Sequence, residues 1–148
     1  MFAKAKGLPQ RFISSITVDP HRPKTVYVTL GASTLRPYAP PRAQGDTGES
    51  VRGGHIYKST NGGRTFHDIS GNLRRLPALW SVIRNGQLIV ATTVGVFASR
   101  GTGGGHYALL GRNLPPAPVF SMQLVPGHPR QLLVASLGRG VYRYTFPK

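Results

Sequence analysis

A pattern of short strands recurs along this chain of 148 residues, and the recurrence restricts the possible folds more than any other feature. Two apolar runs flank a turn cluster at 19–23, and the same plan returns 107 residues later around 126–129. A shorter copy covers 80–92. The third run of each copy carries an aromatic residue at the same place: Tyr57, Phe97 and Tyr142. A unit of roughly 40–45 residues with four strands is typical of β-propeller blades.

We therefore predict an all-β protein in which residues 1–148 form a single β-propeller segment. It would contain about three four-stranded antiparallel blades, which could form half of a six-bladed ring. The predicted blades are blade one at 13–69, blade two at 80–110 and blade three at 119–146. Blade one carries an insertion loop at 32–52, where proline and glycine argue against regular structure.

Blade three runs out of predicted strands after its third. The chain begins with a segment, 2–6, that resembles the close of a fourth strand, because Leu8-Pro9 matches Leu114-Pro115. We therefore expect 2–6 to complete blade three. Since three blades cannot close a ring and open sheet edges invite pairing, two copies joined head to tail are one expectation. An arc of a larger propeller assembly is the other.

Residues 59–66 predict a tight turn between the third and fourth strands of blade one. Asn-Gly-Gly accepts the positive φ angles of such turns, and serine and threonine hydroxyls can satisfy turn amides. The pattern resembles the Asp-box of bacterial neuraminidase repeats, Ser-x-Asp-x-Gly-x-Thr-Trp, with Asn61 in place of Asp and Phe66 in place of Trp. Its structural residues would be Ser59, Asn61, Gly63, Thr65 and Phe66. A degenerate copy with one extra residue and no acid lies at 100–105.

Nearly the whole chain resembles Asp-box propellers, a group that includes sialidase-like repeat proteins, sortilin-type domains and photosystem II assembly-factor propellers. The resemblance implies a structural role for the box turn, not a catalytic one. Because many unrelated functions share this fold, it predicts architecture better than activity.

The charge is unusual: 19 Lys+Arg face four Asp+Glu, giving a net charge of +15. Such a balance attracts polyanions, and guanidinium groups bind carboxylate and phosphate bidentately. In a propeller, the loops from strand two to three and from strand four to one emerge on one face. The candidate residues for binding an anion or an acidic partner on that face are Arg11, Arg36, Arg42, Arg52, Arg74, Arg75, Arg112 and Arg139. The alternative is that the charges are spread over a solvated surface.

An independent glycosidase is disfavoured, because sialidases and related enzymes need flanking carboxyl groups and a cluster of three arginines. The four acids are Asp19, Asp46, Glu49 and Asp68, and none of them is paired in a way that raises a pKa. We predict no catalytic residue, no cofactor and no metal, since the five histidines lie on separate strands or turns. The favoured function is a non-enzymatic binding or assembly scaffold for an acidic protein or other polyanion. The alternatives are a partial, sialidase-like glycoside hydrolase whose carboxylates lie on missing blades, and charge-driven nucleic-acid binding.

No signal peptide is seen in 1–12, so we assign the cytoplasm by default. No run approaches the roughly 18 apolar residues of a membrane span. The absence of cysteine excludes disulfides without deciding the compartment.

Overall fold

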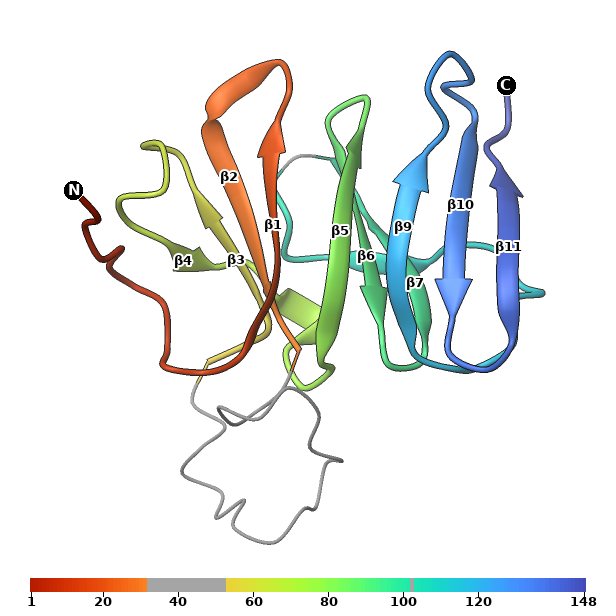
Figure 1. The fold of residues 1–148 in the computed structure, drawn as a ribbon, viewed down its shortest axis with the longest axis horizontal. Coiled ribbons are helices and arrows are strands. Elements are labelled where there is room, and N and C mark those ends of the chain that lie inside the picture. Colours follow the sequence, from red (N-terminus) through yellow and green to blue (C-terminus); the bar gives the residue numbers. More distant parts are fainter. Residues whose placement is uncertain (32–52, 102) are drawn as a thin grey trace, which may run out of the picture.

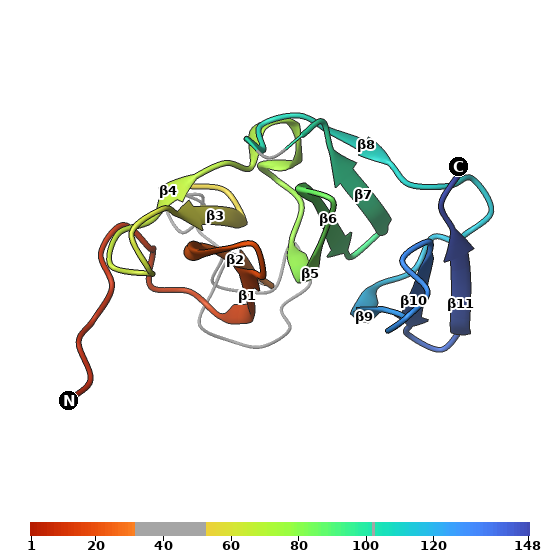
Figure 2. The ribbon, with the colours of Figure 1, turned by 90° about the horizontal axis from the view of Figure 1, so that it is seen from above.

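The computed structural model describes residues 1–31, 53–101 and 103–148, and in these it is all-β, with three antiparallel sheets side by side (Figures 1 and 2). The first sheet contains β1 (Ile13–Asp19), β2 (Arg22–Leu30), β3 (Ile56–Ser59) and β4 (His67–Asp68). The second contains β5 (Ala78–Arg84), β6 (Gln87–Thr92), β7 (Gly95–Ser99) and β8 (Tyr107–Leu109). The third contains β9 (Val119–Leu124), β10 (Gln131–Ser136) and β11 (Gly140–Thr145). A single 3₁₀ turn, η1 (Gly71–Leu73), precedes β5 in the described chain.

Each sheet is a meander in which consecutive strands pair, so the predicted all-β blade arrangement is confirmed. We call the three sheets blade one, blade two and blade three. The outer strands are short: β4 spans two residues and β8 spans three. Before β8, Gly104 and Gly105 both have positive φ, which interrupts the extended backbone.

Two of the three apolar clusters in the described residues lie between neighbouring sheets, and the third lies on blade one. One cluster joins blades one and two and includes Tyr27, Ile56 and Leu88. A second joins blades two and three and includes Ile89, Val119 and Leu132. Strand β6 supplies both clusters in alternation, as expected for a strand buried on both faces.

The N-terminal segment lies against blade one, not against blade three. Lys6 forms an isolated bridge with Thr65, and Leu8 packs with Phe66 on the blade-one cluster that contains Val28. Strand β11 remains at the edge of its own sheet, and the two termini lie far apart (Figure 1). Within one chain, therefore, residues 2–6 do not add a strand to blade three, and completion of that blade by a second copy stays a proposal.

The predicted insertion 32–52 lies outside the described residues. Among the described residues, no helix is long and apolar enough to cross a membrane.

Candidate binding surfaces and the turn of blade one

The turn at 59–66 is built around the side chain of Asn61. Its Oδ1 accepts hydrogen bonds from the amides of Arg64, at 3.1 Å, and Thr65, at 3.0 Å, and from the Ser59 hydroxyl, at 2.9 Å. Its Nδ2 donates to the Thr65 hydroxyl at 2.7 Å. The Ser59 hydroxyl in turn accepts from the Gly63 amide at 3.0 Å. One amide side chain thus closes the whole turn by satisfying backbone donors that the turn leaves unpaired.

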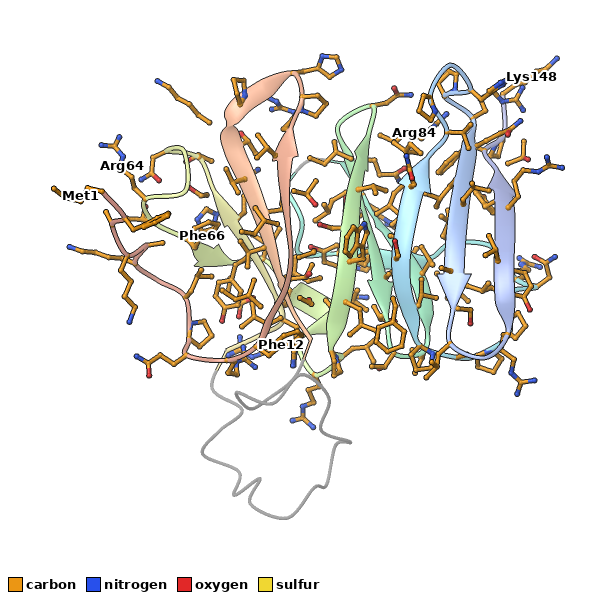
Figure 3. All side chains as sticks on the ribbon, viewed as in Figure 1. Met1, Phe12, Arg64, Phe66, Arg84 and Lys148 are labelled. Atoms are coloured by element: carbon orange, nitrogen blue, oxygen red, sulfur yellow. The ribbon has the colours of Figure 1, made fainter. Side chains whose placement is uncertain are left out.

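Glycine is required where this turn reverses. Gly62 and Gly63 have φ of 73° and 86°, which L side chains rarely adopt. The Phe66 side chain, labelled in Figure 3, packs against the apolar cluster that contains Tyr57, as does Leu8. The turn residues predicted from the sequence are therefore brought together, and their contacts are structural.

A polar network joins the start of β3 to the residues that follow β4 in blade one. The Asp68 carboxylate accepts from the amides of Gly54 and Ser70, each at 2.8 Å, and lies 3.4 Å from the Arg74 guanidinium. Burial opposes ionisation of Asp68, but the hydrogen bonds from Ser70 and Gly54 and the charge of Arg74 outweigh it and lower its pKa. The Ser70 hydroxyl accepts from the amides of His55 and Ile56, so it ties β3 to the loop after β4.

His55 belongs to the same network. Its side chain is almost completely buried, and its Nδ1 lies 2.9 Å from the Arg74 carbonyl oxygen. Burial lowers the pKa of His55, which keeps the ring neutral.

Arg11 lies inside the protein. It is 7% exposed, donates to the Gly54 carbonyl oxygen and lies beside the Tyr57 hydroxyl, which it hydrogen-bonds. Burial lowers the pKa of Arg11, although the Tyr57 hydroxyl and Asp68 act in the opposite direction. Its Nε and Nη1 atoms are buried without a hydrogen-bond partner among the described residues. The guanidinium of Arg11 is therefore buried against its own chain and is not accessible to a binding partner.

Four of the predicted arginines are exposed and lie in connections that, by the alternation of antiparallel strands, join the sheets at one end; the β10–β11 connection is seen at the lower end of Figure 1. Arg74 and Arg75 follow η1, Arg112 lies between β8 and β9, and Arg139 lies between β10 and β11. We call these four the loop-end arginines. The other three candidates, Arg36, Arg42 and Arg52, lie outside the described residues.

Basic side chains also lie at the opposite end of the sheets, where Figure 3 shows Arg64, Arg84 and Lys148. Several of the arginines at this end have internal partners, among them Arg64, whose Nε donates to the Asn61 carbonyl oxygen. Arg84 lies 4.0 Å from the ring centroid of Phe146 and donates to the Pro129 carbonyl, while Arg130 donates to the Phe146 carbonyl. The positive charge of the described chain is therefore not confined to one end.

Both described acids have structural roles. Asp19 is 2% exposed, accepts from the amides of His21 and Arg22, and lies 3.4 Å from the Arg22 guanidinium. Asp68 is held by the network above. No group of three or more potential metal ligands occurs in the part of the chain that the structure describes. Asp46 and Glu49 lie outside it.

Two features of the boundaries between blades were not anticipated from the sequence. The first is a side-chain clamp, in which Asn72 donates to the Tyr107 carbonyl at 2.9 Å and accepts from the Tyr107 amide at 2.8 Å. The side-chain amide of Asn72 thus pairs with β8 as a backbone peptide group would, and it joins the end of blade one to the outer strand of blade two. The recurrence of Asn-Leu at 72–73 and 113–114 was the available signal.

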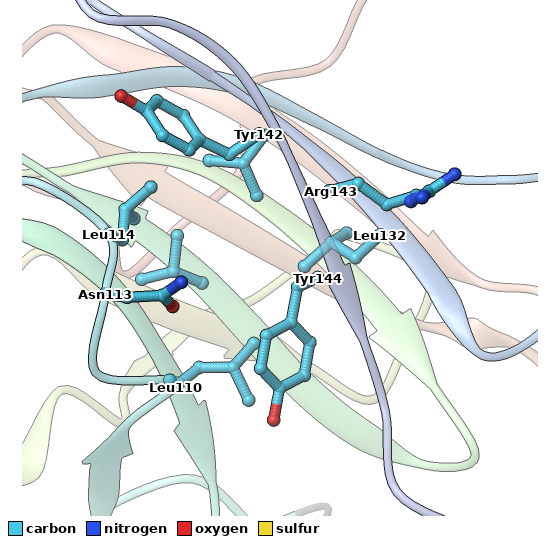
Figure 4. Close-up of a pocket in the computed structure, with 10 residues that line it drawn as sticks. Leu110, Asn113, Leu114, Leu132, Tyr142, Arg143 and Tyr144 are labelled. Atoms are coloured by element: carbon cyan, nitrogen blue, oxygen red, sulfur yellow. The ribbon is translucent and has the colours of Figure 1, made fainter.

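The second feature is a small pocket of about 60 Å³ between blades two and three (Figure 4). Its walls include Leu110, Asn113 and Leu114 from the loop after β8, and Tyr142 and Tyr144 from β11. It is mostly apolar, with room for about four water molecules or the end of one side chain.

Comparison with known proteins supports the fold. No family model matches the chain, and no curated protein matches it by sequence. Among solved structures, it is similar to an ancestral GH74 enzyme, with a TM-score of 0.63 and 14% identity over 93% of this chain. It is also similar to the GH74 xyloglucanase from Xanthomonas campestris, with a TM-score of 0.61 and 14% identity over 91% of this chain. The chain spans 18% and 20% of the lengths of those two proteins, about a fifth of each.

Proposed function

We propose that this chain is a non-enzymatic propeller segment that binds an acidic protein or another polyanion through its arginine-rich loop end. The observation that carries the proposal is the set of four loop-end arginines, which are exposed and lie in three connections at the same end of the adjacent sheets. Arg36, Arg42 and Arg52 belong to the same proposed surface, because they lie in the connection from strand two to strand three.

The chemistry of the loop end supports this function. Of the described acids, only Asp68 lies near these arginines, and it contacts Arg74 alone among them. Arg75, Arg112 and Arg139 are exposed, so their guanidinium groups can reach carboxylate or phosphate oxygens. Arg11 is excluded from the proposed surface because it is buried.

We also propose that the 59–66 turn is an Asp-box type turn with a structural role. The hydrogen bonds of Asn61 support this, since its Oδ1 reaches the amides that an aspartate at the same place could reach.

The test compares two triple variants with the same loss of charge. Arg75, Arg112 and Arg139 are replaced by serine in one variant, and Lys24, Arg64 and Arg100, exposed at the opposite end, are replaced in the control. Affinity for poly-L-glutamate is measured by fluorescence anisotropy at several salt concentrations. The loop-end variant is expected to bind at least tenfold more weakly than the control, with a flatter dependence of log affinity on log salt.

Equal losses in the two variants would mean that net charge alone drives binding, and would refute the loop-end surface. A single-stranded oligonucleotide serves as the second probe. If it binds more tightly than poly-L-glutamate, with a steep salt dependence and no sequence preference, nucleic-acid binding replaces the proposal.

The structural likeness to GH74 enzymes favours one second candidate, an arc of a glycoside hydrolase. The test is binding to xyloglucan by affinity electrophoresis together with an assay for released sugar. Retardation that Asp46→Asn or Glu49→Gln abolishes would support a polysaccharide site. Unchanged mobility and no released sugar would leave the binding scaffold as the function.

A further inference from the structure

The fourth strands of blades one and two are each anchored by an aromatic residue and by a tether from the preceding segment. In blade one the aromatic residue is Phe66, whose amide donates to the Lys6 carbonyl at 2.9 Å, while the Lys6 amide donates to Arg64. In blade two it is Tyr107, which is 2% exposed and is tethered by the Asn72 side chain. In both blades, therefore, the segment that directly precedes the blade in the chain holds its outer strand.

Blade three has the tether but no outer strand among the described residues. Asn113 lies 41 residues after Asn72 and is exposed, and Leu114 lies 41 residues after Leu73. Among the described residues, strand β11 pairs only with β10, so its other edge offers backbone groups to a further strand. The pocket lies beside this edge, next to Tyr144, which corresponds by the repeat to Ser99, the residue paired with Tyr107.

We propose that the N-terminal segment of a second copy of this chain docks here as the fourth strand of blade three. We call the free edge of β11, Asn113 and the adjoining pocket the fourth-strand site. The proposal does not depend on the loop-end arginines, because none of them lines the pocket.

The N-terminal segment suits the site by its exposure and its sequence. Met1 and Phe2 are fully exposed large apolar residues, and the first tie from this segment to its own chain is made at Lys6. In blade two, Ala98 is paired with Ala108. By the repeat, Arg143 occupies the position of Ala98. If Leu8 occupies the position of Leu114, then Phe2 occupies the position of Ala108, and Phe2 lies opposite Arg143. Met1 then falls opposite Tyr144, at the pocket, where a thioether packs well against aromatic rings.

The two ends of the chain present faces that can pack together in such a dimer. Blade one exposes Ile13, Ile16 and Val18 of β1, which are 42%, 67% and 50% exposed. Blade three exposes Leu133 and Val141, which are 39% and 71% exposed, on the face turned away from blade two. Head-to-tail association would cover both faces and bring each N-terminal segment to the partner's β11.

The first test uses the absence of cysteine from the sequence. Single-cysteine variants Phe2→Cys and Arg143→Cys are mixed under mild oxidation and examined on a non-reducing gel. Paired strand residues have Cα atoms about 4.5–5.5 Å apart, within the span of a disulfide. A covalent dimer is expected from this mixture, and little or none from Lys4→Cys mixed with Arg143→Cys, where a two-residue offset exceeds the limit of about 7 Å.

The second test measures molar mass by light scattering on a size-exclusion column across a range of protein concentrations. The full chain is expected to approach twice its mass of 16.0 kDa. Removing residues 1–5 should leave a monomer, and Asn113→Ala should weaken the dimer about tenfold through loss of the two-bond clamp. Arg112→Ser, at the neighbouring exposed position, is the control and should leave dimerisation unchanged. Near-ultraviolet circular dichroism from Trp80 checks that each variant is folded.

A monomer at every concentration together with no cross-link would overturn the proposal. So would equal cross-linking of the Lys4 control, or a dimer that persists without residues 1–5, because either result assigns the contact to something other than the fourth-strand site.

Discussion

Replacing Asn61 with aspartate is expected to stabilise the protein by about 1 kcal/mol at neutral pH. The aspartate carboxylate can accept the same hydrogen bonds from Ser59, Arg64 and Thr65 that Asn61 Oδ1 accepts. Thr65, whose hydroxyl now accepts from Nδ2, can rotate to donate instead. Because bonds to a charged acceptor are stronger than neutral ones, and the chain carries a net charge of +15, the new charge is favourable.

An alanine variant and the dependence of stability on pH give two further expectations for this position. Asn61→Ala removes all four side-chain hydrogen bonds, and at about 0.5 kcal/mol each, the low end for a partly solvated turn, it should cost about 2 kcal/mol. The amide donors hold the pKa of an aspartate here below its unfolded value of about 3.9, so its contribution is present above that pH. The gain should disappear as the pH falls through the lowered pKa of the folded state.

Urea denaturation at pH 7 and at pH 2.5 measures the free energy of unfolding of the parent and both variants. Their midpoint urea concentrations are compared, provided that the slope m is the same for all three. At pH 7 the Asn61→Asp variant should be the most stable, the parent next and the Asn61→Ala variant the least. At pH 2.5 the Asn61→Asp variant should lose its advantage over the parent. If that variant is less stable than the parent at pH 7, or if its advantage does not change with pH, the assignment of Asn61 as the centre of the turn is wrong.

Three other residues give separate expectations. Arg11→Met should be at least as stable as the parent in urea, since a methionine occupies the buried site without the two guanidinium nitrogens that lack a hydrogen-bond partner among the described residues. It should leave affinity for poly-L-glutamate unchanged. The pKa of His55 is lowered in the folded state, so its protonation favours unfolding; stability should decline as the pH falls below about 6.5, and His55→Gln should reduce that decline. Gly71→Ala should lower the melting temperature more than Gly138→Ala does. Both glycines have positive φ, but of the two only Gly71 would bring a Cβ against a backbone atom, the Gly105 carbonyl oxygen.

Each of these expectations has a clear contrary result. Loss of poly-L-glutamate binding in Arg11→Met would place that residue at the binding surface. An unaltered pH profile in His55→Gln would assign the titration to another group. If the two glycine substitutions lower the melting temperature equally, the positive φ alone explains the loss of stability, and the contact with the Gly105 oxygen does not contribute.

The sequence predicted the strands well because their signals are local. Alternating apolar residues, turn clusters and the Asn-Gly-Gly sequence each lie within ten residues, and Asn61 and Thr65 meet as the turn pattern indicates. The short lengths of β4 and β8 were less predictable, because an outer strand ends where neighbouring backbone stops pairing with it.

The candidate site was predicted less completely, because its partners are distant in the chain. Arg11 was assigned to the loop surface by its place in the sequence, whereas its contact with Gly54 spans 43 residues and buries it. The tie between Asn72 and Tyr107 spans 35 residues. A residue's place along the chain gives the end of the sheet to which it belongs, but not the direction of its side chain.

Strand β6 is apolar on both faces, and this affects how well its pairing register is specified during folding. Leu88 and Val90 enter one core, while Ile89 and Ala91 enter the other. Both sets are aliphatic, so a shift of one residue would exchange them without exposing apolar surface to water, and hydrophobicity alone discriminates weakly against the error. Polar contacts at the two ends of the strand distinguish the correct alignment.

At one end of β6 the Ser99 hydroxyl accepts from the Leu88 amide while Gln87 donates to the Ser99 carbonyl, and at the other end the Thr92 hydroxyl donates to the Gly95 carbonyl. A misaligned strand would lose these bonds, two of which are buried from water. We therefore expect these few hydroxyl and amide groups to favour the correct alignment of the central strand.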